Sequence, residues 1–266
     1  MTAILNRSLP YAPWIVPHQR RLPGVMPLPR ADWLYLDDAY SAQMQARADL
    51  LATHRDNVLA LLPEAEVAAQ ELLEEVLHDL PQHGFTIRTE EITRPDKVRI
   101  RADFARPLWT LGHLLQADFC ILQKQGDEHV LTGAVLCFPS SWTLHEKLGK
   151  PLLRIHVPVE SYDTGMGRRV QRMFDGMRPE QPLWRANLLR YSNPDLYQPR
   201  AEFAPKDKSG AGDYIRSERQ CLLKLPRSGA VVFSIHTAQV YRKDLTPAQE
   251  TALREIDTSA KPVART

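Results

Sequence analysis

The spacing of apolar residues changes near Leu108, and this change limits the folds open to the chain. Before it, apolar side chains recur about every 3.6 residues from Ser41 to Leu62 and from Pro63 to Leu80, which predicts two helices. After it, runs of strand length predominate, at 117–124, 129–138, 184–191, 219–225 and 230–240. The sequence therefore predicts an α+β fold with a helical N-terminal region and a mostly antiparallel sheet.

Helix-capping patterns mark shorter helices within the second region. Thr143 and Glu146 form a T-x-x-E pattern before a helix expected at 144–148, and Gly149 can supply its left-handed final residue. A further helix fits 166–177, and a final one begins at the similar box of Thr246 and Gln249. These patterns predict where each helix begins and ends.

The first 35 residues are rich in proline, which favours extended backbone. Because aromatic residues are interspersed there, we expect an ordered arm that wraps the body. The predicted organisation is an arm with helices packed on the core at 1–107, a core at 108–257 and a flexible tail at 258–266.

Charge and cysteine content exclude several classes of partner. The 34 basic and 32 acidic residues give a formal charge of +2, which does not indicate a nucleic-acid partner. Prolines interrupt residues 1–17, so neither a signal peptide nor a membrane span is expected there. Cys120, Cys137 and Cys221 each lie in an apolar run and are expected to be buried free thiols, which favours a cytoplasmic location.

Common signatures for nucleotide, nicotinamide and flavin binding are absent, as is any C-x-x-C pair. A redox reaction in this chain would therefore need electrons from another protein. The lack of a C-x-x-C-H motif means that any heme would be held without covalent attachment.

Ordered fragments along nearly the whole chain carry a family resemblance. They include Cys137-Phe-Pro-Ser-Ser-Trp142, Glu146-Lys-Leu-Gly149, Ile155-His-Val-Pro-Val159, Trp184-Arg185, Ser217-Glu-Arg-Gln220 and Leu225-Pro-Arg-Ser-Gly-Ala230. In these the chain resembles the alpha subunits of heme-dependent oxidative N-demethylases, which are similar to dimethylamine monooxygenase. The resemblance implies a PAS-like core that holds heme b noncovalently.

His156 is the best candidate for the ligand of the heme iron that the resemblance implies, because Ile155 and Val157 would supply apolar walls. The alternative is a strand histidine that only bonds a backbone carbonyl. His145 is a rival ligand near the usual position in heme-binding PAS domains, although a solvated helix residue is the simpler interpretation.

A heme would also need cationic partners for its two propionates. Candidates are Arg185, Arg219, Arg227 and Lys147. An ordinary surface ion pair is the alternative for each of them. Trp142 and Trp184 are candidates to stack near the macrocycle, or they are ordinary core residues.

Three residues are candidates for catalysis. Glu218 would pair with a cationic amine, and Tyr162 or His236 would relay protons. A structural ion pair is the alternative for Glu218. His236 stands where arginine is usual in the family, and Glu160 is a second departure, which leaves the substrate and the activity in doubt.

The resemblance thus implies a monooxygenase that uses dioxygen to demethylate a small methylated amine and releases formaldehyde. A separate reductase with its own cofactors would supply the electrons. A noncatalytic PAS-like sensor or carrier of heme or a gas is the alternative, and the sequence leaves open whether the chain forms a homo-oligomer.

Overall fold

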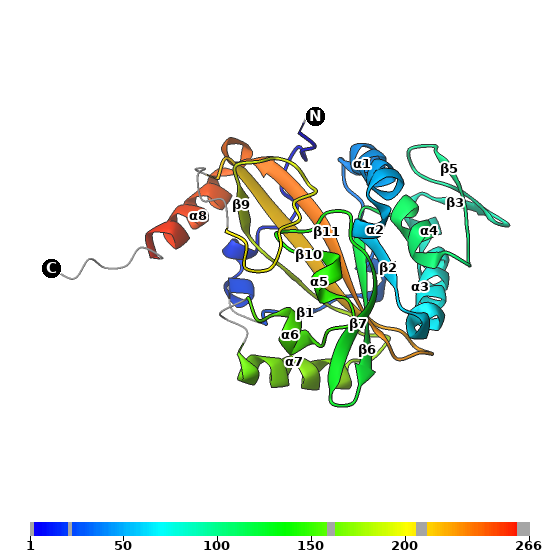
Figure 1. Cartoon of the computed structure of the whole chain (residues 1–266). Helices are drawn as coiled ribbons and strands as arrows, with labels where there is room; N and C mark the ends of the chain where they lie inside the picture. The colour runs from blue at the N-terminus through cyan, green and yellow to red at the C-terminus, as the bar shows by residue number, and fades with distance from the viewer. Residues whose placement is uncertain (1–2, 21–22, 159–162, 206–211, 260–266) are drawn as a thin grey trace.

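One antiparallel sheet organises the molecule (Figure 1). The computed structural model describes residues 3–20, 23–158, 163–205 and 212–259. The strands run in the order β1-β8-β10-β11-β6-β7-β2, and β9 pairs with β10. Their bounds are β1 Met26–Pro27, β2 Leu59–Leu61, β6 Asp118–Gln125, β7 Glu128–Val135, β8 Leu183–Ala186, β9 Leu189–Tyr191, β10 Tyr214–Lys224 and β11 Val231–Tyr241.

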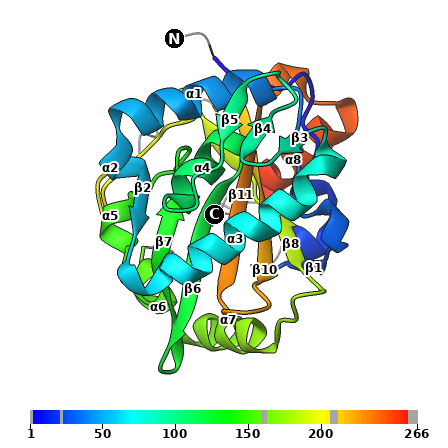
Figure 2. The same ribbon diagram turned by 90° about the vertical axis from the view of Figure 1, so that its right-hand side faces the viewer.

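Helices cover both faces of this sheet, as Figures 1 and 2 show. The first face carries α1 (Tyr40–Thr53), α2 (Arg55–Val58), α3 (Glu66–Asp79) and α4 (Pro107–Leu114), beside a small sheet of β3 (Thr86–Arg88), β4 (Glu91–Thr93) and β5 (Arg99–Arg101). The second face carries α5 (Leu144–Lys147), α6 (Leu152–Ile155) and α7 (Thr164–Gly176). The last helix, α8 (Pro247–Ser259), contacts the short 3₁₀ helix Pro13–Ile15 of the N-terminal arm.

Alternation along the long hairpin β10–β11 separates two sets of polar residues. Successive side chains of a strand point to opposite faces of the sheet. Glu218 therefore faces α5 and α6, whereas its neighbour Arg219 faces the arm and is paired in register with His236 of β11.

A buried ion pair fixes the chain where β7 ends. Arg47 of α1 donates to Asp118 of β6 over 2.6 Å, and both side chains are almost wholly buried. The Asp118 carboxylate also accepts from the backbone amides of Cys137 and Phe138. With three donors, this carboxylate compensates for the cost of burying the charge, and it holds the start of the segment that leads into α5.

Most predicted elements are confirmed, but two are wrong, and the strand expected at 184–191 is divided into β8 and β9. The helix expected from Ser41 to Leu62 is shorter, because α1 ends at Thr53 and Leu59–Leu61 pairs with β7. Pro63 disfavours helical backbone at Leu62, and the backbone of Leu59–Leu61 pairs instead with β7 at the edge of the sheet. His156 is not in a strand, since it follows the one-turn helix α6.

The two capping boxes have different outcomes. At α8, Gln249 N donates to Thr246 Oγ1 and Thr246 N donates to Gln249 Oε1, so that box is confirmed. At α5, Thr143 makes no capping bond; its hydroxyl donates to the Glu146 carboxylate instead. Gly149 adopts a φ of 70°, as expected for the left-handed residue.

The α+β class with an antiparallel sheet is confirmed at that level. The division at residue 107 stays a prediction, although β1 and β2 from the N-terminal region both join the sheet. The predicted tail begins inside α8, and 260–266 lie outside the described residues. In the described ranges no helix has the length and apolar character needed to span a membrane.

Candidate functional site

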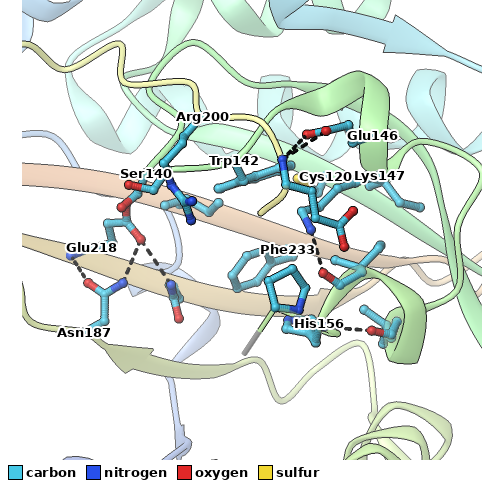
Figure 3. A pocket seen from close by; sticks show the side chains of 18 of the residues that line it. Cys120, Ser140, Trp142, Glu146, Lys147, His156, Asn187, Arg200, Glu218 and Phe233 are labelled. Carbon is cyan, nitrogen blue, oxygen red and sulfur yellow. Dashed lines mark hydrogen bonds between the residues drawn. The ribbon is translucent and has the colours of Figure 1, made fainter. Parts of the chain in front are cut away.

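A cavity of about 380 Å³ lies between the sheet and the short helices α5 and α6 (Figure 3). This volume is within the usual range of sites for small molecules and cofactors. The strands supply an apolar floor, and polar groups lie around it. The apolar lining residues are Cys120, Leu122, Leu131, Trp142, Leu152, Ile155, Pro158, Leu189, Phe233 and Ile235.

His156 lines this cavity at the C-terminal end of α6. Its Nδ1 lies 2.8 Å from the carbonyl oxygen of Leu152, one turn earlier. Because a carbonyl only accepts, Nδ1 carries the hydrogen and Nε2 carries the ring's lone pair. Burial lowers the pKa of His156, so the ring is neutral near pH 7. A neutral imidazole with one nitrogen fixed by a backbone carbonyl is the usual state of a metal-binding histidine.

Buried guanidinium groups line the same cavity. Nε of Arg185 and Nε of Arg200 are buried and have no acceptor in the part of the chain that the structure describes. Burial also lowers the pKa of Arg185, although Glu218 opposes this effect. Buried donors are normally satisfied. The two groups therefore favour a ligand that brings acceptor oxygens.

Lys147 adds a third basic side chain to the lining. Its Nζ donates to the carbonyl oxygen of Ile155 over 2.6 Å, and burial lowers its pKa. This bond also ties α5 to the end of α6, directly before His156.

Glu218 is 5% exposed and is held by a network of donors. One carboxylate oxygen accepts from Arg216 over 3.1 Å, and the other accepts from Asn187 over 2.7 Å and Gln220 over 3.3 Å. In Figure 3 Glu218 and Asn187 lie at one end of the cavity, and Phe233 lies between them and His156. The cavity thus joins a fixed carboxylate at one end to a histidine at the other.

Glu146 attaches the segment that carries Arg200 to this site. Both of its carboxylate oxygens accept from the backbone amide of Glu202, each over 3.0 Å. Glu202 in turn forms an ion pair of 2.7 Å with Arg154 of α6. The acidic residue that was expected to cap a helix therefore holds one wall of the cavity.

The structure brings five of the predicted site residues to this cavity. They are Trp142, Lys147, His156, Arg185 and Glu218. His145 is exposed on α5 and is not among the lining residues. Tyr162 and Glu160 lie outside the described residues.

Three other candidates lie away from the cavity. Arg219 is on the opposite face of the sheet, where it donates to the carbonyl oxygens of Asp32 and Trp33. Arg227 is exposed in the turn after β10 and pairs with Glu71 and Glu74 of α3. Trp184 also faces the arm side, beneath the Arg219 guanidinium.

His236 belongs to a buried polar cluster under the arm. Its Nδ1 lies 2.7 Å from the hydroxyl of Tyr11, and its Nε2 lies 3.4 Å from Asp37 Oδ2. Burial lowers the pKa of His236 to about 4, an effect that Asp37 opposes and Arg219 supports. These contacts link the arm to β11 on the face that lacks the cavity.

Sequence reasoning missed several lining residues. Side chains two residues apart in a strand share a face of the sheet. This period would have predicted that Gln220 faces the cavity with Glu218, and that Phe233 and Ile235 face it together. Arg200 and Glu202 lie in an irregular segment between β9 and β10. In such a segment the sequence has no periodic pattern that predicts which side chains point toward the cavity.

The fold and the cavity define an α+β class of protein, with one histidine and three basic side chains around an apolar slot. A family model described as "Haem-dependent oxidative N-demethylase, alpha subunit-like" matches residues 24–264. The chain therefore belongs to this family, and membership assigns it heme and an oxidative N-demethylase-like function. The name also implies a system of more than one subunit.

The residues of the cavity fit a heme. In the described ranges no cluster of three or more His, Cys, Asp or Glu could hold a bare metal ion, but a heme needs only one protein ligand to its iron. His156 can be that ligand. Arg185, Arg200 and Lys147 can form ion pairs with the two propionates of a heme, and the apolar floor can pack against its macrocycle.

Proposed function

We propose that this chain is the heme-binding subunit of a monooxygenase that removes a methyl group from a small methylated amine. The observation that carries the proposal is the combination, in one cavity, of the neutral His156 and two arginines, Arg185 and Arg200, whose buried Nε atoms have no acceptor among the described residues. The proposed core is PAS-like and holds heme b noncovalently, which the antiparallel sheet and the absence of a C-x-x-C-H motif support.

The proposed reaction balances with dioxygen and an external reductant. The methylated amine, O₂, two electrons and two protons give a carbinolamine and water. The carbinolamine then loses formaldehyde and leaves the shorter amine. The heme, when bound, supplies the activation of dioxygen, and a separate reductase supplies the electrons.

The chain's own residues bind and orient the reactants in this proposal. The Leu152 carbonyl fixes the tautomer of the His156 ring, so Nε2 is the nitrogen that would bind the iron. Arg216, Asn187 and Gln220 hold the Glu218 carboxylate at the far end of the cavity. There it would pair with the ammonium group of the substrate and place an N-methyl group toward the centre.

The first test is the absorption spectrum of protein produced with a supply of heme, for wild type, His156→Ala and His145→Ala. We expect a Soret band in the wild type that is lost or shifted in His156→Ala. His145→Ala is the matched control, because this histidine is exposed nearby, and its spectrum should equal that of the wild type.

The second test is consumption of reductant with and without methylated amines, together with an assay for formaldehyde. Amine-dependent consumption with equal formaldehyde is the expected result. A wild type without a Soret band would overturn the proposal. A heme protein that consumes no reductant with any amine would instead be a sensor or carrier of heme or a gas.

A further inference from the structure

Helix α7 presents an unusual set of basic side chains to solvent. Arg168, Arg169 and Arg172 are exposed, and they fall within about 100° of arc on the helix. Arg178 is exposed just beyond its C-terminal end. None of the four guanidinium groups pairs with a carboxylate among the residues that the structure describes; Arg169 only contacts Met166 Sδ.

Several other charged groups on the surface are paired within the chain. The acidic helix α3 has partners for Glu71 and Glu74 in Arg227, and for Glu75 and Asp79 in Arg30. Within α7, the carboxylate of Asp175 is paired with Lys124 of β6 over 2.6 Å. Since the whole chain carries only +2, the grouping of four arginines at α7 is a local positive surface.

The inner face of α7 packs directly on the wall of the cavity. Phe174, Val170 and Met173 share one hydrophobic cluster with the lining residues Leu152 and Ile155. Close packing at Gly167, where an added Cβ would lie 3.0 Å from Leu153, holds α7 against α6. The exposed arginines are therefore about one helix diameter, roughly 10 Å, from the cavity wall.

We propose that the exposed face of α7, formed by Arg168, Arg169 and Arg172 with Arg178, is the docking surface for an acidic electron-donating protein. This inference rests on the proposed function, which requires electrons from another protein. Unpaired like charges steer an oppositely charged partner into contact. A donor seated here would bring its redox centre close to the heme cavity without entering it.

The surface does not suit two other anionic partners. A membrane-binding helix inserts an apolar face into the lipid, but the apolar face of α7 is packed inside the protein and its outer face is charged. A nucleic-acid-binding protein usually has a clear excess of basic residues, which this chain lacks.

The test measures binding of an oxidised plant-type [2Fe–2S] ferredoxin, a small acidic electron carrier, by calorimetry at several salt concentrations. The full-length protein is used as purified, and its heme content is recorded separately. The test variant is Arg168→Glu/Arg169→Glu/Arg172→Glu, in which glutamate keeps a high helix propensity at all three positions of α7. The matched control is Arg88→Glu/Lys97→Glu/Arg99→Glu, which makes the same change of charge in the exposed β3–β5 region.

We expect wild-type binding that weakens as salt rises from ~20 to ~300 mM. The α7 variant should bind at least about tenfold more weakly than the wild type, and the control should differ by about twofold or less. Equal weakening of both variants, or no binding by the wild type, would overturn the proposal. So would α7-dependent binding of anionic vesicles or DNA in place of the ferredoxin. Calorimetry measures docking of the ferredoxin without catalytic turnover. A protein that contains no heme can therefore be told apart from a protein that does not dock.

Discussion

Glu218 and Arg219 are neighbours in β10, yet they lie on opposite faces of the sheet in different surroundings. Glu218 is in the cavity with three side-chain donors, whereas Arg219 bonds the backbone of the arm. Because successive side chains of a strand point to opposite faces of the sheet, only one of these two residues can contact a ligand in the cavity.

Glu218→Gln tests the proposed role of the carboxylate in binding an ammonium group. Loss of a charge-assisted hydrogen bond costs about 1.5–3 kcal/mol, so we expect amine affinity to fall by about tenfold or more. Amine-induced changes in the heme spectrum measure this affinity. The spectrum without amine should be unchanged, and the exposed Glu180→Gln should behave as the wild type. Unaltered amine affinity in Glu218→Gln would contradict the role.

His236 makes the stability of the protein depend on pH in a defined direction. Its pKa is about 4 in the folded state, mainly because of burial, and about 6.5 in the unfolded chain. The unfolded chain therefore binds the proton more readily between these values. Its contribution to stability is fully present above about pH 6.5 and falls as the pH is lowered toward 4.

His236→Gln removes this titration, so its free energy of unfolding should fall less between pH 7 and pH 4.5 than that of the wild type. The difference should be on the order of 3 kcal/mol over the full interval. Urea unfolding at each pH measures it. Parallel pH profiles for the two proteins would show that His236 does not carry the effect.

At the scale of elements, the central strands of the sheet could be predicted from the sequence and its edge strands could not. The hairpin β6–β7 and strand β11 were predicted because these strands are long, at 8, 8 and 11 residues, and rich in apolar residues. β1 and β2 have two and three residues, so tertiary pairing and not local preference decides them.

The same limit applies to the candidate site. His156, Trp142 and Lys147 were expected from fragments that match the family, and they do line one cavity. Arg200 could not be predicted, because its position depends on a distant bond between Glu202 and Glu146. Contacts of this kind leave no periodic trace in the sequence.

Glu146→Ala should detach the segment of Arg200 and Glu202 from α5. We expect heme affinity to fall by about tenfold, which corresponds to the loss of one or two hydrogen bonds to a charged group. Titration with heme, followed by absorbance, measures this. Thr246→Ala is the comparison: it removes a true cap and should destabilise the protein by about 1 kcal/mol without changing heme affinity. A similar heme affinity for Glu146→Ala and wild type would contradict the role of this bond.

At the scale of the whole molecule, the N-terminal arm joins parts that are far apart in sequence. Asn6 exchanges backbone and side-chain bonds with Gln239, and Trp14 Nε1 donates to the carbonyl oxygen of Gln249. Trp14 is 2% exposed in a cluster with Ile215 and Leu253, separate from the cavity. The arm therefore stabilises the end of the sheet without touching the candidate site.

Trp14→Ala should destabilise the protein by about 3–5 kcal/mol, which lowers Tm by on the order of 10 °C. Heme affinity below the transition should stay within about twofold of the wild-type value. Thermal unfolding measures the first effect and heme titration the second. Ile15→Ala, at an exposed position in the same 3₁₀ helix, should change stability by less than about 0.5 kcal/mol. Joint loss of stability and heme affinity would show that arm and cavity are coupled.

Both edge strands of the large sheet come from the first 61 residues, while their partners β8 and β7 come much later. During synthesis, β1 has no partner until the chain has been extended beyond Ala186. Such distant pairings slow folding, because the long intervening loop must close before any contact stabilises it. Strand β1 must therefore remain unpaired while most of the chain is made, which gives molecular chaperones a defined interval in which to act on it.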